Sequence, residues 1–415
     1  SEITNNGFGS VGEKPKGLLY ISFVRCDSVI SLKQLTAQYD TNEENLKQRI
    51  KESTIPATIK NFKITTYNED STAVVIDMTD YLVSADEAID PFSPWAPILA
   101  GGERVMEKEF RRENSQVVSI KAFEDNVSVK SSLTYGLSLK NKVMYIFQRE
   151  PFTAVMTRSF ILLPEHPMRP RLADPRIAIF SQGVSVFNGD SRGAQARYYA
   201  QRWNLEPKDM EQYRKGVLTE PKKPIVFYVD DAFPAMWKEP VRKAALRWNV
   251  AFEKIGLKNV IQVRDFPKDD PTFDPDNLKY SCIRYVPAAI TNAMGPSWTD
   301  PRTGEIINAS VIIFNDVVKL ANQWRFLQTS QVDPSVRTKK MPDNILEESI
   351  EYIVAHEVGH TLGLMHNMSA SAAYPVDSLR SAKFTQKYGT TPSIMDYARF
   401  NYVAQPEDKG VKLTP

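Results

Sequence analysis

Three of the four histidines in this chain lie within one run of eleven residues near its C-terminal end. His356 and His360 are four residues apart, so on a helix their side chains project from the same face, one turn apart. At that spacing two imidazoles can bind one metal ion with bonds of about 2.0–2.1 Å. Glu357 follows the first histidine directly, where its carboxylate would act as a base on water beside the metal and not as a ligand. These residues predict a metal-dependent hydrolytic site.

His366 is the candidate for a third ligand, but it cannot bind the same metal from a continuous helix. Six further helical residues would carry it about 9 Å along the axis from His360. The helix must therefore end between them, and Gly363 lies where the chain needs a residue that adopts the left-handed conformation. Three histidines leave one coordination position for water, as in catalytic zinc sites. The alternative is three structural histidines at the end of one buried helix.

The elements that must position this cluster follow a strand–helix–strand pattern after residue 215. A helix is predicted over Asn344 to Leu362, with Asp343 or Asn344 as its N-cap. An earlier helix is predicted from Pro240 to Ile255, because proline favours the first turn and Gly256 favours an end. Buried strands are predicted at Ile225–Val229, Val260–Val263, Ser281–Val286 and Ala309–Phe314. Residues 300–304 predict a turn, so the segments on either side of it are expected to form a hairpin. The last strand, with this preceding hairpin, is either the sheet edge that receives an extended peptide or an interior strand.

The first half of the chain has a different pattern. Short runs rich in valine, isoleucine, phenylalanine and tyrosine recur between polar turns, which is typical of an all-β unit with hairpins. Residues 164–176 contain four prolines and predict an extended loop, residues 198–216 predict a polar helix, and residues 219–224 predict a linker. We therefore expect an α+β protein with a β-rich N-terminal domain over residues 1–215 and a catalytic domain over residues 216–415.

Composition excludes several classes of protein. Lysine and arginine total 52 against 50 aspartate and glutamate residues, a formal net charge of +2, and no basic stripe suited to nucleic-acid phosphates is present. No apolar run approaches the roughly 18–20 residues that cross a bilayer. The chain begins at Ser1 without a charged and then apolar leader, so its first residues do not decide the compartment.

The histidine cluster resembles the zinc signature of a known clan. Residues 356–366 have the form H-E-x-x-H-x-x-G-x-x-H, the signature of metzincin metalloproteases. Residues 393–397, S-I-M-D-Y, resemble the Met-turn of that clan, in which the methionine, here Met395, lies beneath the metal. More narrowly, residues 224–408 resemble the bacterial Met-zincin family of exported zinc-dependent metalloproteases, which carry N-terminal domains of uncharacterised function. The N-terminal half resembles that family only in domain arrangement.

The resemblance implies a role for each matching residue. His356, His360 and His366 would bind one catalytic Zn²⁺, and Glu357 would act as the general base on a zinc-activated water and pass the proton to the leaving amine. Tyr397 corresponds to the tyrosine that binds zinc and stabilises the oxyanion in astacin-like and serralysin-like metzincins. A tyrosine packed beneath the site is the alternative interpretation of Tyr397.

Other features leave the subfamily and the ligands open. Asn367 does not match the Glu, Pro, Ser or Asp that follows the third histidine in the best-known subfamilies, so substrate preference stays open. The aspartate-rich residues 265–276 are either a Ca²⁺ site or a solvated loop. Only 20 residues follow Met395, so we expect either that the natural chain continues beyond Pro415 or that the N-terminal domain completes the catalytic core.

We expect a zinc metalloendopeptidase that acts on protein or peptide substrates. The family resemblance further implies an exported protein, located in the periplasm, at the cell surface or in the medium. Three alternatives remain: a metal-binding adhesion or receptor module without turnover, a hydrolase of another amide such as a cell-wall peptide, and a latent enzyme with the β-rich domain over its cleft. The sequence does not determine the oligomeric state.

Overall fold

A computed structural model describes residues 3–5, 17–87, 89–92, 105–141, 144–189 and 193–415. The chain forms two compact units. The N-terminal unit comprises residues 1–165 and 183–197, and the catalytic unit comprises residues 166–182 and 198–415. The units therefore differ from a division of the chain at residue 215, because residues 166–182 and 198–215 pack with the C-terminal half.

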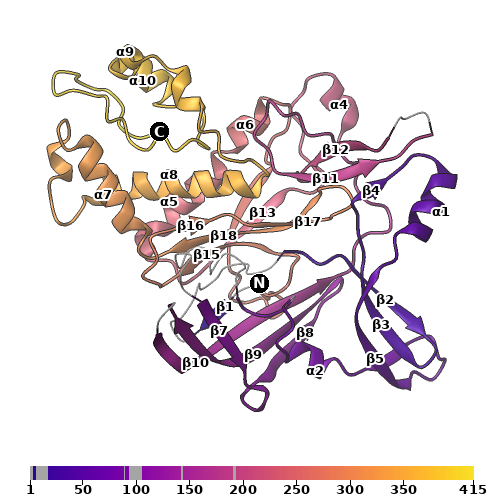
Figure 1. The fold of residues 1–415 in the computed structure, drawn as a ribbon. Coiled ribbons are helices and arrows are strands. Elements are labelled where there is room, and N and C mark those ends of the chain that lie inside the picture. The colour runs from indigo at the N-terminus through magenta and orange to yellow at the C-terminus, as the bar shows by residue number, and fades with distance from the viewer. Residues whose placement is uncertain (1–2, 6–16, 88, 93–104, 142–143, 190–192) are drawn as a thin grey trace. The chain divides into compact units, whose positions relative to one another are not determined.

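Two antiparallel sheets make up most of the N-terminal unit (Figure 1). Its longest strands, β9 (Asn126–Lys140) and β10 (Tyr145–Ile161), pair along most of their length. The remaining strands of that sheet are β1 (Ile3–Asn5), β7 (Val105–Phe110) and β8 (Gln116–Ala122). A second sheet contains β2 (Ile21–Cys26), β3 (Val29–Gln34), β5 (Ala57–Tyr67) and β6 (Val74–Ile76). Its described helices are α1 (Glu44–Ser53), α2 (Thr79–Leu82) and the 3₁₀ turn η1 (Arg112–Asn114).

Alternating apolar residues form the core of the N-terminal unit. Leu133, Tyr135 and Leu137 on β9 face Phe152 and Ala154 on β10, and all five are buried. The apolar residues alternate along β9, so their side chains share one face of the sheet, and the intervening Thr134, Gly136 and Ser138 are buried as well. The β-rich N-terminal domain predicted from the sequence is therefore confirmed.

A small third sheet joins β4 (Tyr39–Asp40), β11 (Ser181–Val186) and β12 (Gln195–Ala200). Within the N-terminal unit, β11 pairs with β4 in parallel at Ser185 and Tyr39.

The catalytic unit contains a twisted mixed sheet of six strands in the order β14, β13, β15, β18 and β16, with β17 also paired to β18. The strands are β13 (Ile225–Val229), β14 (Ile261–Asp265), β15 (Ser281–Val286), β16 (Ala293–Met294), β17 (Ser297–Thr299) and β18 (Ile306–Phe314). The first four strands in the order run parallel, whereas β16 and β17 run antiparallel to β18. Strand β18 is thus interior, so the alternative that made it the substrate-binding edge is wrong.

Two helices cover one face of this sheet: α5 (Ala235–Leu246) and α8 (Asp343–Thr361) (Figure 1). Their apolar faces meet the sheet in one core that contains Phe227, Val241, Ile313 and Val354, each less than 2% exposed. The unit also contains α6 (Asn249–Glu253), α7 (Val317–Thr329), α4 (Met210–Arg214) and the 3₁₀ turn η2 (Pro334–Val336). The predicted α+β architecture with a long helix beneath a mixed sheet is confirmed.

Two helix starts differ from the sequence prediction. Helix α5 begins at Ala235, and the buried Pro240 lies inside it rather than at its first turn. Helix α8 begins at Asp343 after Pro342, which makes no side-chain cap. The backbone oxygen of Pro342 accepts the first helical hydrogen bonds, from the amides of Ile345 and Leu346. A proline therefore starts α8, where Asp343 or Asn344 was expected to cap it.

The predicted polar helix over residues 198–216 is also wrong, because only α4 is helical there. Tyr198 and Ala200 are extended and pair with Ala173 and Arg171. These long-range backbone pairings override the local helix propensity. Residues 219–224, which were expected to be a linker, are fixed to the rest of the unit, since Thr219 forms a backbone bridge with Leu257.

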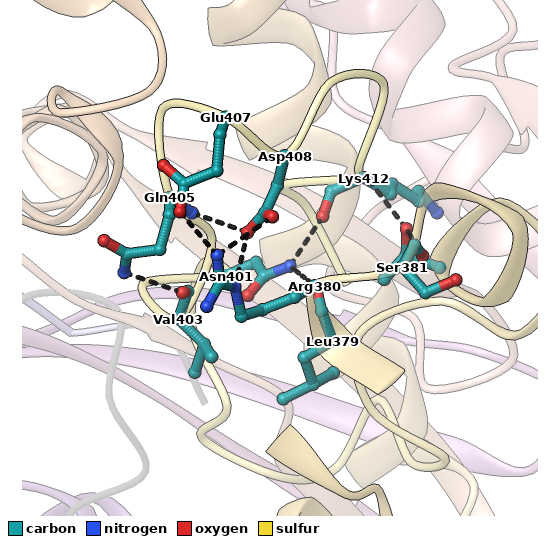
Figure 2. A network of polar contacts seen from close by, with 10 residues as sticks. Leu379, Arg380, Ser381, Asn401, Val403, Gln405, Glu407, Asp408 and Lys412 are labelled. Atoms are coloured by element: carbon teal, nitrogen blue, oxygen red, sulfur yellow. Dashed lines mark hydrogen bonds and ion pairs between the residues drawn. The ribbon is translucent and has the colours of Figure 1, made fainter. Parts of the chain in front are cut away.

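Residues 370–415 contain η3 (Ala370–Ala373), α9 (Val376–Leu379) and α10 (Ala382–Tyr388), followed by a tail that folds back on these helices. Figure 2 shows the polar contacts that fix this tail. The guanidinium of Arg380 pairs with Asp408 and Glu407, and the Asn401 side chain donates to the backbone oxygens of Leu379 and Lys412. Among the described residues, no helix is long and apolar enough to span a bilayer.

Candidate metal centre

Helix α8 presents the first two histidines, and the chain returns the third. The helix ends after Thr361, and Gly363 then adopts φ of 95°. The Leu364 amide donates to the oxygen of Gly359, which closes the helix end in the manner of a glycine C-cap. The turn places His366 beside His356 and His360, as the spacing argument predicted.

The three imidazoles converge through their Nε2 atoms. The Nε2 atom of His366 lies 3.2 Å from the Nε2 atom of His360 and 3.2 Å from that of His356. These distances bring three nitrogen atoms into one group that can hold a metal ion. Zinc–imidazole bonds are about 2.0–2.1 Å long, so the group needs only small adjustments to bind one ion.

Backbone carbonyls fix the orientation of two of these rings. The Nδ1 atom of His356 lies 2.7 Å from the oxygen of Ile394, and the Nδ1 atom of His360 lies 2.8 Å from the oxygen of Leu364. A carbonyl only accepts hydrogen bonds, so each Nδ1 carries the proton and each Nε2 presents a lone pair. Such partners of ligand histidines orient the ring for the metal. The donor set therefore fits a zinc ion.

Burial keeps the imidazoles neutral. It lowers the pKa of His356 to about 4, and it also lowers the pKa of His360 and of His366, the most exposed of the three. Neutral imidazole is the form that binds a metal. At neutral pH the cluster thus has its metal-binding protonation state before any ion arrives.

Glu357 lies on α8 next to the first ligand. It is 8% exposed, and burial raises the pKa of its carboxyl group to about 8. The backbone oxygen of Glu357 is in close contact with Gly295, between the edge strand β16 and β17: a Cβ atom at that glycine would collide with it. The sheet edge therefore passes directly over the part of the helix that bears Glu357 and His360.

The Met-turn forms the floor of the site. Met395 is 3% exposed, and a Cβ atom at Gly359 would collide with its sulfur and with Trp248. The oxygen of Met395 accepts a hydrogen bond of 2.9 Å from the amide of Asn367, directly after the third histidine. The indole of Trp248 also donates to the oxygen of Ala355 in α8. The methionine thus packs between the helix and the returning loop, as its place in the resemblance implied.

Tyr397 lies against the imidazole rings of two of the three histidines. Its ring centroid is 4.4 Å from that of His366 and 5.4 Å from that of His356, and the residue is 43% exposed. The guanidinium of Arg399 lies 4.1 Å from the Tyr397 ring centroid and 3.7 Å from that of Trp324, so it is held between the two rings. Arg399 has φ of 59°, an uncommon backbone conformation for a residue with a side chain.

The structure thus assembles the histidines, Glu357, Met395 and Tyr397 in one place. Sequence reasoning missed four neighbours of this site: Phe180, Trp203, Trp248 and Arg399. Arg399 lies only two residues after Tyr397, so its proximity was a usable signal. Phe180 and Trp203 lie more than 150 residues before the cluster and belong to no recognisable motif.

For the aspartate-rich loop, Asp270 and Asp274 accept hydrogen bonds from amides of their own loop, and a calcium site there stays a prediction.

Comparison with known protein families supports a zinc site at the three histidines. Residues 338–415 match the family model described as Met-zincin, and residues 14–208 match that of a domain of unknown function, DUF5117. No curated protein and no solved structure matches the chain. The Met-zincin match covers all three histidines and the Met-turn, so the predicted resemblance is confirmed. The chain is therefore similar to Met-zincin proteins over the segment that holds the histidine cluster, and to the DUF5117 domain over most of its first half.

Proposed function

We propose that this protein is a zinc endopeptidase in which Glu357 is the general base. The observation that carries the proposal is the convergence of three Nε2 atoms, two of them oriented by backbone carbonyls, directly beside a buried glutamate. A structural histidine cluster would not need its lone pairs directed at one point. A metal-binding module without turnover would not need the glutamate.

The histidines and Glu357 have different roles in the proposed hydrolysis. Zinc, when bound by His356, His360 and His366, would supply a Lewis acid that polarises a carbonyl and lowers the pKa of water to about 7. The positive charge of a bound zinc ion would favour the ionised form of Glu357 over the neutral acid. The Glu357 carboxylate would then take a proton from water and pass it to the nitrogen of the leaving amine. The buried surroundings of Glu357 exclude bulk solvent that would compete for that proton.

The sheet edge offers a place for an extended substrate. Strand β16 is paired with β18 on one side and ends the order of the sheet. It precedes Gly295, whose close approach to α8 holds the edge against the helix turn of Glu357 and His360. A peptide that adds to this edge would use main-chain hydrogen bonds, which accept varied side chains. This supports a peptide substrate and places the edge at β16 instead of β18.

Tyr397 is the group we assign to oxyanion stabilisation. Its position against the rings of two ligand histidines puts the phenol at the open side of the site. The guanidinium of Arg399, 4.1 Å from the ring centroid, also contacts the Tyr397 ring. Replacing Tyr397 by Phe keeps the ring and removes the hydroxyl group. We expect kcat to fall about a hundredfold while the zinc affinity is unchanged. An unchanged kcat would instead support a packing role.

The test of the proposed activity is cleavage of a mixed peptide library by the zinc-loaded full chain. The variant Glu357→Gln should still bind one zinc ion and lose about 10²–10⁴-fold in rate. The matched control is Glu347→Gln, which changes an exposed glutamate on the same helix and should cleave like the parent. If the zinc-loaded parent cleaves no peptide, or if Glu357→Gln keeps its rate, the proposal is wrong.

Export is a further part of the proposal and rests on the family resemblance. Fractionation of cells that produce the natural protein, with detection by antibody, tests it. Recovery only from the cytoplasm would contradict it.

A further inference from the structure

Two segments from the first half of the chain are built into the metal-binding unit. They are residues 177–182 and 198–203, here called the strap. Both belong to the catalytic unit, although both lie within the part of the chain that matches DUF5117 and before the Met-zincin match. The backbone amide of Gln201 donates to the oxygen of Phe180, with a distance of 2.8 Å, so the two segments are joined to each other.

The strap binds the turn between the second and third histidines. The amide of Phe180 donates to the oxygen of Gly363 at 2.8 Å, and the amide of Met365 donates to the oxygen of Ala178 at 2.9 Å. Ile179 and Leu364 form the antiparallel bridge between these two hydrogen bonds. The turn that carries His366 is therefore paired with a strand and does not rely on its own local contacts.

The strap also binds the end of α8. The final carbonyls of a helix have no partner within it, and the indole Nε1 of Trp203 donates to the oxygen of Thr361 at 2.8 Å. Two residues after Thr361, a Cβ atom on Gly363 would collide with the backbone oxygen of Gln201. Gly363 thus serves two purposes: it adopts the positive φ that turns the chain, and it lets the strap approach closely.

The other end of the strap is fixed to the central sheet. The amide of Arg202 donates to the oxygen of Gly304, and the amide of Ile306, the first residue of β18, donates to the oxygen of Arg202. The ring of Phe180 lies 6.0 Å from that of His360, centroid to centroid. One continuous set of contacts therefore runs from an interior strand to a ligand imidazole.

We infer that the strap is a positioning element for the metal site: its backbone and Trp203 hold the turn of residues 361–366 so that His366 returns to His360. This assigns a role to part of the DUF5117 segment. The inference rests on the three histidines being a metal site, as proposed above, and not on the identity of the substrate. Partners of this kind change metal affinity by about 10–100-fold when they are mutated.

The test measures zinc affinity in the full chain by competition with a chelator. Trp203→Phe removes the indole donor and keeps an aromatic ring, and Phe180→Ala removes the ring beside His360. Each should weaken zinc binding about tenfold. The matched controls are Tyr198→Phe and Ile177→Ala, which change exposed side chains of the same strap and should bind zinc like the parent.

A second readout separates positioning from simple packing. Visible absorption of the cobalt(II)-substituted protein reports ligand geometry, and thermal unfolding of the zinc-free protein reports stability. We expect Trp203→Phe to alter the cobalt spectrum. If both variants only lower the unfolding temperature, or fail to fold, while zinc affinity in any folded variant stays within about twofold of the parent, the strap is ordinary core and the inference is wrong. None of these measurements uses a peptide, so they stand even if the proposed endopeptidase activity fails.

Discussion

Each unit buries an arginine, and the two arginines differ in their hydrogen-bond partners. In the catalytic unit, Arg325 is 3% exposed and donates to Thr414 and Glu348, with its guanidinium 4.7 Å from the ring centroid of Phe400. In the N-terminal unit, Arg158 is 9% exposed and donates to the backbone oxygen of Leu82. Its Nε and Nη1 atoms have no hydrogen-bond partner in the part of the chain that the structure describes, whereas in Arg325 the Nε atom alone lacks one.

The difference shows what each unit uses its polar residues for. A buried charge is costly unless it is paired and hydrogen-bonded. Burial lowers the pKa of Arg158 to about 10 and lowers that of Arg325 too, but Glu348 opposes the second shift. In the catalytic unit, polar contacts fix the positions of loops around a site. In the N-terminal unit, apolar packing of β9 and β10 forms the core, and Arg158 donates to a backbone oxygen, that of Leu82.

Zinc removal should produce the largest difference in stability between the two units, because only the catalytic unit contains the histidine cluster. At free zinc about 1,000 times its dissociation constant, binding stabilises the folded state by about 4 kcal/mol. We expect chelation to lower the free energy of unfolding of the catalytic unit by that amount. Hydrogen exchange of α8 amides should quicken, and exchange in β9 and β10 should not change. Equal loss of protection in both units would contradict this.

The two arginines give the next largest contrast. Arg325→Met removes two hydrogen bonds and leaves Glu348 and Thr414 without this partner, so we expect a loss of about 2 kcal/mol in the free energy of unfolding. Arg158→Met replaces a poorly paired charge by an apolar side chain of similar length and should stay within about 1 kcal/mol of the parent. Urea unfolding of both variants measures the difference. A larger loss for Arg158→Met would show that a partner of its guanidinium has been overlooked.

Two glycines sharpen the comparison further. A Cβ atom on Gly359 would collide with Met395 and Trp248, whereas one on Gly17 in the N-terminal unit would meet nothing within 4 Å. Overpacking a core costs about 1–3 kcal/mol, partly offset by about 1 kcal/mol of better helix propensity. We expect Gly359→Ala to lose about 1 kcal/mol of stability and to weaken zinc binding. Gly17→Ala is the control and should match the parent in both measurements.

The smallest expected effect is a pH dependence in the tail of the catalytic unit. Hydrogen bonds from Arg380 lower the pKa of Asp408 below its ordinary value of 3.8. The stabilisation is therefore fully present above that ordinary value and is lost as the pH falls through the lowered pKa. Arg380→Met should melt slightly below the parent at about pH 6, and the gap should close as the pH falls through the lowered pKa. A gap that is the same at every pH would mean that the arginine acts through packing alone.

The sequence was sufficient to predict the metal ligands, because their geometry is local. His356 and His360 share a helix face by period alone, and the chain length to His366 requires a break where Gly363 lies. Met395 and Tyr397 came from the resemblance. The strap could not be predicted in this way, because residues 177–182 and 198–203 bind the turn mainly through backbone atoms, which leave no side-chain pattern.

The fold was predictable wherever burial follows a simple period. Strands β13 and β15 have the predicted bounds, and α8 differs from its predicted range by one residue at each end. The errors lie where distant partners decide the outcome. Residues 198–203 have a local helix preference, yet backbone hydrogen bonds to Arg171, Phe180 and Gly304 keep them extended. Whether β18 was an edge depended on β16 and β17, which are too short to show a pattern.

The position of the strap in the sequence affects how the two matched segments can be inherited. The DUF5117 match ends at residue 208, after both strap segments, so a recombination event at that border would transfer the strap with the N-terminal domain. The recipient would gain Trp203 and Phe180 without the turn that they hold, and the donor would keep three histidines whose turn has lost its partner strand. We therefore expect the two matched segments to be inherited together.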